Sequence, residues 1–310
     1  MQAEPVLPSA PEFLHLPRVV PAGGSKWAHC FAGPARAIAS HGQIILRAGA
    51  VVHPNGEVFD DGAASDERDA AVFALAAGEG ISLGRFLAGP LAAGFAAESG
   101  RRFEYCGARL SARQAEVLRK LGKADGYVQL QGPARFRSVI TEMQGSPANA
   151  VGPHMRALAD RLRAPPGAGD RRLAILPVRE TERFSLTNRA SLTAWLRAKK
   201  FEVVEPEATP LDATAASLAA ASLIILSDPE QAGLLSLCAP GAKILEIAPE
   251  GWLGATARCV CQIFGLNWTP FLANAPAYPL LTAIPFGARV PLSYDIPIRA
   301  LAKTLDGETL

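Results

Sequence analysis

The stretch that decides the fold runs from Arg171 to Glu250 and reads RRLAILPVRETERFSLTNRASLTAWLRAKKFEVVEPEATPLDATAASLAAASLIILSDPEQAGLLSLCAPGAKILEIAPE. Four short apolar runs recur in it, and segments with helical spacing separate them. The runs are Leu173 to Val178, Phe201 to Val204, Ser222 to Leu226 and Ala242 to Ala248. Apolar runs that alternate with helices are typical of a parallel sheet buried on both faces. We therefore predict an α/β fold whose C-terminal parallel sheet carries helices on both faces.

Polar residues follow these runs at the place where such a sheet binds its ligand. An open parallel sheet holds ligands at the carboxyl ends of its strands. Arg179 and Arg183 follow the first run, Asp228 and Glu230 follow the third, and Glu246 stands late in the fourth. We therefore expect a functional site along this edge.

Helices are predicted between the strands from caps and apolar spacing. One begins near Thr187 or Asn188, both acceptable caps, and buries Leu192, Trp195 and Leu196. The other helices are expected at Pro210 to Ala221, Gln231 to Leu237, Trp252 to Phe264 and Ile298 to Thr304.

The N-terminal half gives fewer signals. A hairpin is predicted over residues 41–62, where Pro54-Asn55-Gly56 makes the turn. Residues 66–98 are rich in alanine and compatible with helix. Helices are also expected at residues 111–121, which open on a Ser111/Gln114 capping box, and at 151–163, whose buried face carries Met155, Leu158, Ala159 and Leu162; Tyr127 to Leu130 is a strand candidate.

The segment APPGAGD, Ala164 to Asp170, reads as a linker between two domains. A chain of 310 residues is long enough for two. We predict an N-terminal α/β domain over residues 1–165 and a C-terminal Rossmann-like domain over 170–275. The remainder, 276–310, is predicted to be a tail that crosses back to the first domain, by analogy with two-domain transferases.

Composition excludes several classes of protein. Hydrophobic residues make up 49% and charged residues 19% of the chain, which is typical of a globular protein. The formal net charge of +2 gives no basis for binding nucleic acid. The sequence has no run of 18 apolar residues, and its N-terminus lacks the features of a signal peptide. We therefore expect a cytoplasmic protein.

Cysteines and acids give no metal signature. The five cysteines, Cys30, Cys106, Cys238, Cys259 and Cys261, are scattered, form no CxxC pair, and are expected to be buried free thiols. Asp60 and Asp61 are adjacent and fit a solvated turn. No Asp-x-Asp triplet occurs, which disfavours a metal-dependent single-domain transferase. We expect neither a metal nor a cofactor.

The second domain resembles glycosyltransferase family 61, the capsular polysaccharide biosynthesis proteins, over Arg171 to Trp268. The motifs that carry the resemblance are LAILPVRETERFSLTN, FEVVEPEATPL, ASLIIL and APGAKILEIAP, in the family's order and spacing. The hairpin at residues 41–62 also looks like an early segment of such proteins. The resemblance implies two Rossmann-like domains arranged as in GT-B enzymes.

The implied activity is metal-independent transfer of a sugar from a nucleotide-sugar donor to a surface polysaccharide or glycan acceptor. Arg179 and Arg183 would offset the negative charge of the leaving diphosphate. The helix beginning near Gln231 would point N–H groups at a phosphate, with Gly233 allowing close approach. Asn188 would be a further ligand group, and the family gives Glu246 the ribose hydroxyls. A polysaccharide assembly complex at the inner membrane would be a partner.

Each of these residues also has a structural alternative. Arg179 and Arg183 have Glu180 and Glu182 beside them and fit a solvated ion-pair loop. Asn188 fits a helix cap, and Glu246 needs a partner if it is buried. Asp228 and Glu230 are poor neighbours for a phosphate. The acceptor base would come from the first domain, and the sequence does not choose among His29, His41, His53, Asp60, Asp61 and Glu104.

The chain also departs from the family. Where the family has a His-Gly-Ala-Gly-Leu-x-Asn-like signature, this chain reads Glu230 to Ser236, so Glu230 replaces the histidine and Ser236 the asparagine. The aromatic-His-Trp motif of the first domain is missing. These departures favour a second hypothesis, a catalytically degenerate scaffold or regulatory subunit in polysaccharide biosynthesis. An unrelated nucleotide enzyme has no support, because no GxGxxG follows a predicted strand and neither a P-loop nor GxSxG occurs.

Overall fold

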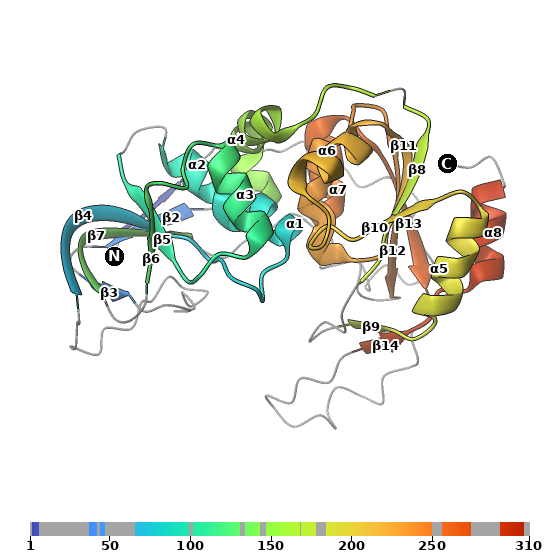
Figure 1. Cartoon of the computed structure of the whole chain (residues 1–310), viewed down its shortest axis with the longest axis horizontal. Coiled ribbons are helices and arrows are strands. Elements are labelled where there is room, and N and C mark those ends of the chain that lie inside the picture. Colours follow the sequence, from blue (N-terminus) through green and yellow to red (C-terminus); the bar gives the residue numbers. More distant parts are fainter. Residues whose placement is uncertain are drawn as a thin grey trace.

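The computed structural model describes residues 2–5, 37–41, 44–46, 66–98, 102–130, 134–142, 147–167, 169–177, 184–249, 256–273 and 292–306. These residues form a mixed α/β structure in layers (Figure 1). From left to right in Figure 1 lie a seven-stranded sheet, helices α1 to α4, helices α6 and α7, a five-stranded sheet, and helices α5 and α8. We call the seven-stranded sheet with α1 to α4 the first lobe, and the remaining elements the second lobe.

The second lobe is built on a wholly parallel sheet. Its strands are β8 (Arg171–Ile175), β10 (Glu202–Val204), β11 (Ala221–Leu226), β12 (Lys243–Pro249) and β13 (Asn267–Ala273). Their order across the sheet is β10-β8-β11-β12-β13. The predicted C-terminal parallel sheet is thereby confirmed. Ranked along the chain, the strands stand in the order 2-1-3-4-5, a doubly wound order whose switch point lies between β8 and β11.

Helices cover both faces of this sheet, as predicted. They are α5 (Arg189–Ala198), α6 (Leu211–Ala219), α7 (Thr256–Phe264), α8 (Ile298–Asp306) and the 3₁₀ helix η4 (Pro229–Leu237). Helices α5 and α8 lie on one face, and α6 and α7 lie on the other (Figure 1). Leu192 and Leu196 of α5 are fully buried, as the apolar spacing predicted, whereas Trp195 of the predicted face is only partly buried.

The described part of the tail packs on the second sheet. Strand β14 (Leu292–Tyr294) pairs in parallel with β9 (Phe184–Leu186) to form a separate two-stranded sheet. Tyr294, Ile296 and Leu301 belong to the same apolar cluster as Leu192. These residues therefore pack on the second lobe and not on the first, to which the tail was predicted to cross back.

The first lobe has a mixed sheet. Its strands are β1 (Gln2–Pro5), β2 (Ala37–His41), β3 (Ile44–Leu46), β4 (Asp66–Ala74), β5 (Glu104–Gly107), β6 (Tyr127–Gln129) and β7 (Ala134–Glu142). Strands β7, β4, β5 and β6 run parallel in that order, and β1, β2 and β3 add antiparallel pairs beside β7. Ranked along the chain, these four strands stand in the order 3-2-1-4, which is part of the 3-2-1-4-5-6 order of dinucleotide-binding sheets. The architecture is therefore compatible with a Rossmann-like fold.

The helix expected over residues 66–98 is wrong in its first part, where β4 lies. The helical part is one continuous run of α1 (Leu83–Phe86), the π-helical turn η3 (Leu87–Leu91) and α2 (Ala92–Glu98). Val72 and Phe73 are fully buried and pack into different apolar clusters. A strand buried on both faces shows no alternation, so the alanines gave a helical signal that tertiary packing overrides.

Two other predictions for the first lobe are confirmed. Helix α3 (Ala112–Lys120) opens on the Ser111/Gln114 capping box, and α4 (Pro147–Leu162) buries all four residues of the predicted face. Strand β3 lies in the predicted hairpin, and residues 47–62 of that hairpin lie outside the described residues. Cys106, Cys238, Cys259 and Cys261 are buried and outside disulfide bonds, as expected, and Cys30 is outside the described residues.

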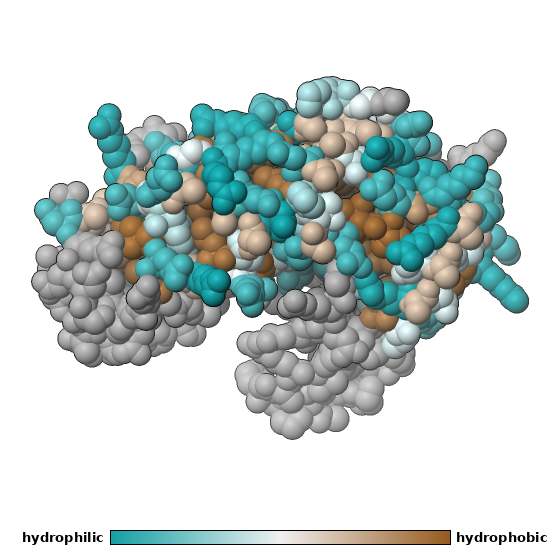
Figure 2. All heavy atoms as spheres, viewed as in Figure 1, coloured by the Kyte–Doolittle hydropathy of each residue, from teal (hydrophilic) through white to brown (hydrophobic). Residues whose placement is uncertain are grey.

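The lobes meet through two helical layers that share one apolar cluster. The cluster includes Phe86 and Leu118 from the first lobe and Leu234 and Val260 from the second. At its edge, α1 and η4 touch backbone to backbone: a Cβ at Gly84 would overlap the backbone of Gln231, and a Cβ at Gly233 would overlap the carbonyl oxygen of Gly84. Only glycine fits at either position. On the face shown in Figure 2, hydrophilic residues are spread over both lobes, with hydrophobic residues visible between them.

Gly233→Ala is expected to destabilise the protein. The added methyl group meets backbone rather than a flexible side chain, so the two helices have to separate, at a cost of about 1–3 kcal/mol. Gly80→Ala is the matched control, because a Cβ at Gly80 meets nothing within 4 Å. Urea unfolding followed by circular dichroism measures both variants. Equal stability of the two would contradict the close contact.

Candidate functional site

The switch point of the second sheet places two polar residues directly after β11. Strands β8 and β11 end level with each other, since Ile175 pairs with Leu226, and the Ser227 amide donates to the Ile175 carbonyl at 3.0 Å. Ser227 is 1% exposed, and its Oγ has no hydrogen-bond partner within the described part of the chain. Asp228 follows it and is 7% exposed. Ligands of open α/β sheets bind at this point of the topology.

The C-terminal part of the chain also contacts the switch point, through Tyr294 of β14. The hydroxyl of Tyr294 donates to the Ser227 carbonyl at 3.1 Å, and the Thr187 hydroxyl donates to the Tyr294 carbonyl, also at 3.1 Å. Burial, with the nearby Asp228 charge, raises the pKa of the Tyr294 phenol, which therefore stays protonated. The small β9-β14 sheet is thus fixed to the end of β11.

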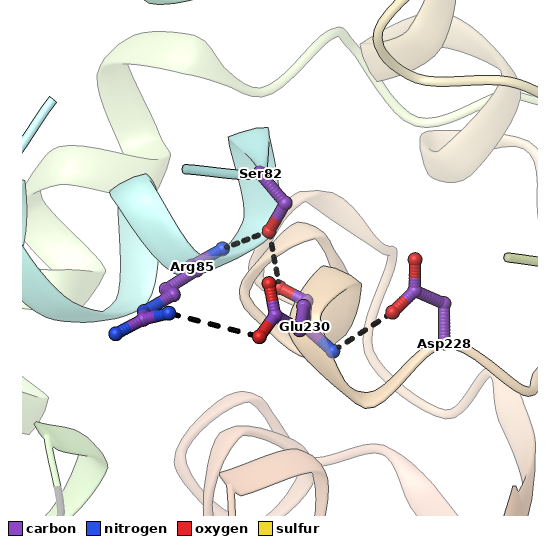
Figure 3. Close-up of polar contacts among 4 residues, drawn as sticks. All are labelled: Ser82, Arg85, Asp228 and Glu230. Atoms are coloured by element: carbon purple, nitrogen blue, oxygen red, sulfur yellow. Dashed lines mark hydrogen bonds and ion pairs between the residues drawn. The ribbon is translucent and has the colours of Figure 1, made fainter. Parts of the chain in front are cut away.

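Asp228 caps η4, the helix that the sequence assigned to phosphate binding (Figure 3). Its Oδ1 accepts from the Glu230 amide at 3.1 Å, and its carbonyl accepts from the Gln231 amide at 3.0 Å. Two N–H groups of this helix end are therefore already bound to Asp228. A phosphate bound at this helix end would be repelled by the Asp228 carboxylate, in line with the prediction that Asp228 and Glu230 are poor neighbours for a phosphate.

Glu230 and Gln231 bind the first lobe instead of facing an open crevice. The Ser82 hydroxyl donates to the Glu230 carbonyl at 3.0 Å, and Arg85 forms an ion pair with the Glu230 carboxylate at 3.7 Å (Figure 3). The Gly84 amide donates to Gln231 Oε1 at 3.0 Å. Glu230 and Gln231, at the start of η4, therefore hold the two lobes together.

Gly233 lies in the middle of η4, against α1. Its missing side chain allows close approach, as the sequence predicted, but the group that approaches is the Gly84 carbonyl. Ser236 donates its hydroxyl to the Gly233 carbonyl at 2.7 Å and is buried. A ligand role for Gly233 stays a prediction, and packing already explains why this residue is a glycine.

Asn188 occupies the N-cap position of α5 without capping the helix through its side chain. Instead Nδ2 donates to the Ile296 carbonyl at 2.8 Å, and Oδ1 accepts from the Ile296 amide at 3.2 Å. Both ends of the amide are thus used to hold the segment that leads into α8. Ile296 packs in the apolar cluster on the face of the sheet that α5 and α8 cover, opposite the face with η4.

Glu246 is a buried acid level with the end of the neighbouring strand β11. It pairs with Leu226, the last residue of β11, and is 2% exposed. Its Oε2 accepts from the Trp268 indole at 2.7 Å. Strand alternation puts it on the same face as Ile244, towards α7. The predicted need for a partner is met by Trp268, and binding to a ribose stays a prediction.

Two carboxyl groups at this edge titrate near neutrality. Burial raises the pKa of Glu246 to about 7, against the opposing hydrogen bond from Trp268. Burial also raises the pKa of Asp228 to about 6, and the charges of Glu230 and Glu207 add to the rise while the Glu230 amide lowers it. Perturbed carboxyls at a topological switch point are typical of functional sites, although structural acids show them too.

Several predicted site residues lie outside the described part of the chain. Arg179 and Arg183 fall between Pro177 and β9, so their contacts are not described. Of the candidate acceptor bases, His29, His53, Asp60 and Asp61 are also outside it. His41 is the last residue of β2, and Glu104 is exposed at the first residue of β5, the amino end of a parallel strand.

Neither a metal-ligand cluster nor a membrane span is found in the described residues. No group of three or more His, Cys, Asp or Glu residues there lies close enough together to hold a metal ion. None of the helices that the structure describes is long and apolar enough to cross a membrane.

Comparison with known proteins adds no relative. No protein-family model matches the chain, and no curated protein matches it. The support for a functional site at the switch point, with Asp228 and Glu246, is therefore its geometry alone.

Stability is expected to fall as pH rises from about 5 to 8. A folded-state pKa of about 7 for Glu246, against an ordinary 4.5, means that the folded state binds more protons than the unfolded state in this window. Glu246→Gln keeps an acceptor for the Trp268 indole and removes the carboxyl group that titrates. The variant should lose part of the slope and exceed the wild type by roughly 2–3 kcal/mol at pH 8.

Chemical unfolding at several pH values measures this slope. Glu79→Gln is the control, because Glu79 is exposed and far along the chain from β12. Parallel pH profiles for the wild type and Glu246→Gln would show that Glu246 is ionised at no cost, contrary to its burial.

Proposed function

We propose that this chain is a glycosyltransferase that moves a sugar from a nucleotide-sugar donor to a surface polysaccharide or glycan acceptor. The observation that carries the proposal is the 2-1-3-4-5 sheet, whose switch point is flanked by Arg179 and Arg183 in sequence and by Asp228 and Glu246 in space. Nucleotides bind at such switch points. The two lobes would correspond to the two domains of a GT-B arrangement.

In this proposal the donor diphosphate lies beside the segment that follows β8. Arg179 and Arg183 would bind it and stabilise the charge that develops on the leaving group, in place of a metal ion. The end of η4 is a poor site for it, since Asp228 already binds the Glu230 amide. Glu246 stands level with the end of β11 and would approach the ribose if the Trp268 contact opens. The acceptor would bind on the first lobe.

A degenerate scaffold or regulatory subunit remains the second candidate, and one observation favours it. The residues that replace the family signature, Glu230 and Gln231, bond to Ser82, Gly84 and Arg85 of the first lobe. They therefore contribute to lobe contact instead of substrate contact. A scaffold need not bind a nucleotide, so nucleotide binding separates the two candidates.

Calorimetric titration and thermal shift with UDP, GDP, CMP and their sugars test the proposal. One nucleotide is expected to bind, and at a hundredfold excess over its dissociation constant it should add about 2.7 kcal/mol to the free energy of unfolding. Arg183→Ala should abolish the shift by removing a phosphate contact. Arg119→Ala, at an exposed position of α3, is the matched control and should keep it.

If no nucleotide shifts the wild type at millimolar concentration, the transferase proposal is wrong. The scaffold then becomes the leading candidate, and co-purification with proteins of a polysaccharide assembly complex at the inner membrane becomes the next measurement.

A further inference from the structure

Each lobe supplies a carboxylate to the N-terminus of a helix in the other lobe. Glu207, after β10, accepts through Oε1 from the Leu83 amide at the start of α1, at 2.7 Å. Glu116, on α3, accepts through Oε2 from the Leu211 amide at the start of α6, at 2.9 Å. The first amides of a helix have no partner within the helix, and negative charge is favourable there.

Arginines of the first lobe bind the C-termini of two helices in the second. Arg156 on α4 donates from Nε and an Nη to the Ile263 carbonyl near the end of α7, at 3.0 and 2.6 Å. Arg163, just after α4, donates to the Ser236 carbonyl near the end of η4, at 2.6 Å, and stacks over Phe264. Positive charge is favourable at helix C-termini, where carbonyls lack partners.

These four contacts match the helix dipoles in sign at every end. Glutamates accept from amides at two helix N-termini, and arginines donate to carbonyls at two helix C-termini. The glutamate contacts cross the boundary in both directions, because Glu207 of the second lobe binds α1 and Glu116 of the first lobe binds α6. Lys120 and Asp212 add an ion pair between α3 and α6. Within the second lobe, Gln231 Nε2 donates to Glu207 Oε1 at 3.1 Å, which ties the α1 cap to η4. These polar contacts thus join the same helices whose apolar residues form the cluster that both lobes share.

We propose that the two lobes form one cooperative unit and that their boundary does not open in the native state. Separation would break the four helix-end contacts, uncover an apolar layer that includes Phe86 and Leu234, and part the Gly84–Gly233 backbone contact at the same time. Any ligand at the switch point therefore binds with the lobes already in place. This inference holds whether or not the chain is a transferase.

Amide hydrogen exchange on the ligand-free protein tests the proposal. The amides of Leu83, Gly84 and Leu211 donate only across the boundary, so they report its opening directly. The amides of Val117 in α3 and Val260 in α7 lie inside helices, so their exchange reports the unfolding of each lobe and not the separation of the two. The three boundary amides are expected to exchange with the same protection factor as these core amides. Boundary amides that exchange many-fold faster would overturn the proposal.

Leu192→Val supplies a second, independent measurement. Leu192 is fully buried in the apolar cluster on the far side of the second sheet, away from the boundary. The substitution is mild enough to fold, and it should speed exchange at Val117 of the first lobe by the same factor as at Val260 of the second. Unchanged exchange at Val117 would mean that the lobes unfold separately.

Glu207 variants identify the contact itself. Glu207→Gln keeps an acceptor for Leu83 and should exchange like the wild type at that amide. Glu207→Ala removes the acceptor and should speed exchange of the Leu83 amide more than that of Val117. Equal exchange of Leu83 in Glu207→Ala and the wild type would show that the cap does not hold the boundary.

Discussion

The contact between the backbones of α1 and η4 is the constraint on which the arrangement of the two lobes depends. Neither Gly84 nor Gly233 can carry a side chain without pushing the helices apart. Their closeness brings Ser82, Leu83 and Gly84 within hydrogen-bond reach of the turns after β10 and β11. Those turns carry Glu207 and Glu230, next to Asp228. The geometry of the switch point in one lobe is therefore set by a helix of the other.

The second lobe could be predicted from the sequence because its strands are buried and its caps are local. Each of the four apolar runs became a parallel strand of the expected sheet. The fifth strand, β13, escaped prediction because it is an edge strand, carries Pro270, and is only partly buried along most of its length. Its pattern has neither the continuous apolar run of a central strand nor a clean alternation.

The first lobe resisted prediction for a different physical reason. Its central strand β4 begins with the charged residues Asp66, Glu67 and Arg68 and continues through alanines, so its local preference is not for a strand. The strand is fixed by pairing with β5 and β7, which lie far along the chain. Elements with local signals were predicted: α3 and α4 by a capping box and a regular apolar face, and β6 by its short apolar run.

The sequence predicted which polar residues lie near the strand ends better than it predicted what those residues bind. The sequence indicated that polar side chains would gather where strands end, and Asp228 and Glu246 do lie there. It did not indicate the partners: Asn188 binds Ile296, Glu246 binds Trp268, and Gly233 meets Gly84. These partners come from long-range topology, which no local pattern encodes. Ser227, whose hydroxyl lacks a partner among the described residues, was missed because serine at a strand end is an ordinary turn residue.

The contacts between the lobes also bear on the order in which the chain is synthesised. Gly84 leaves the ribosome 147 residues before Gln231, the residue whose Oε1 its amide binds. At synthesis rates of about 5–20 residues per second, the gap lasts roughly 7–30 s. During that interval the nascent first lobe carries the apolar side of α1, α3 and α4 without the helices that will cover it. The newly made half therefore exposes this apolar surface until the helices of the second lobe have been synthesised.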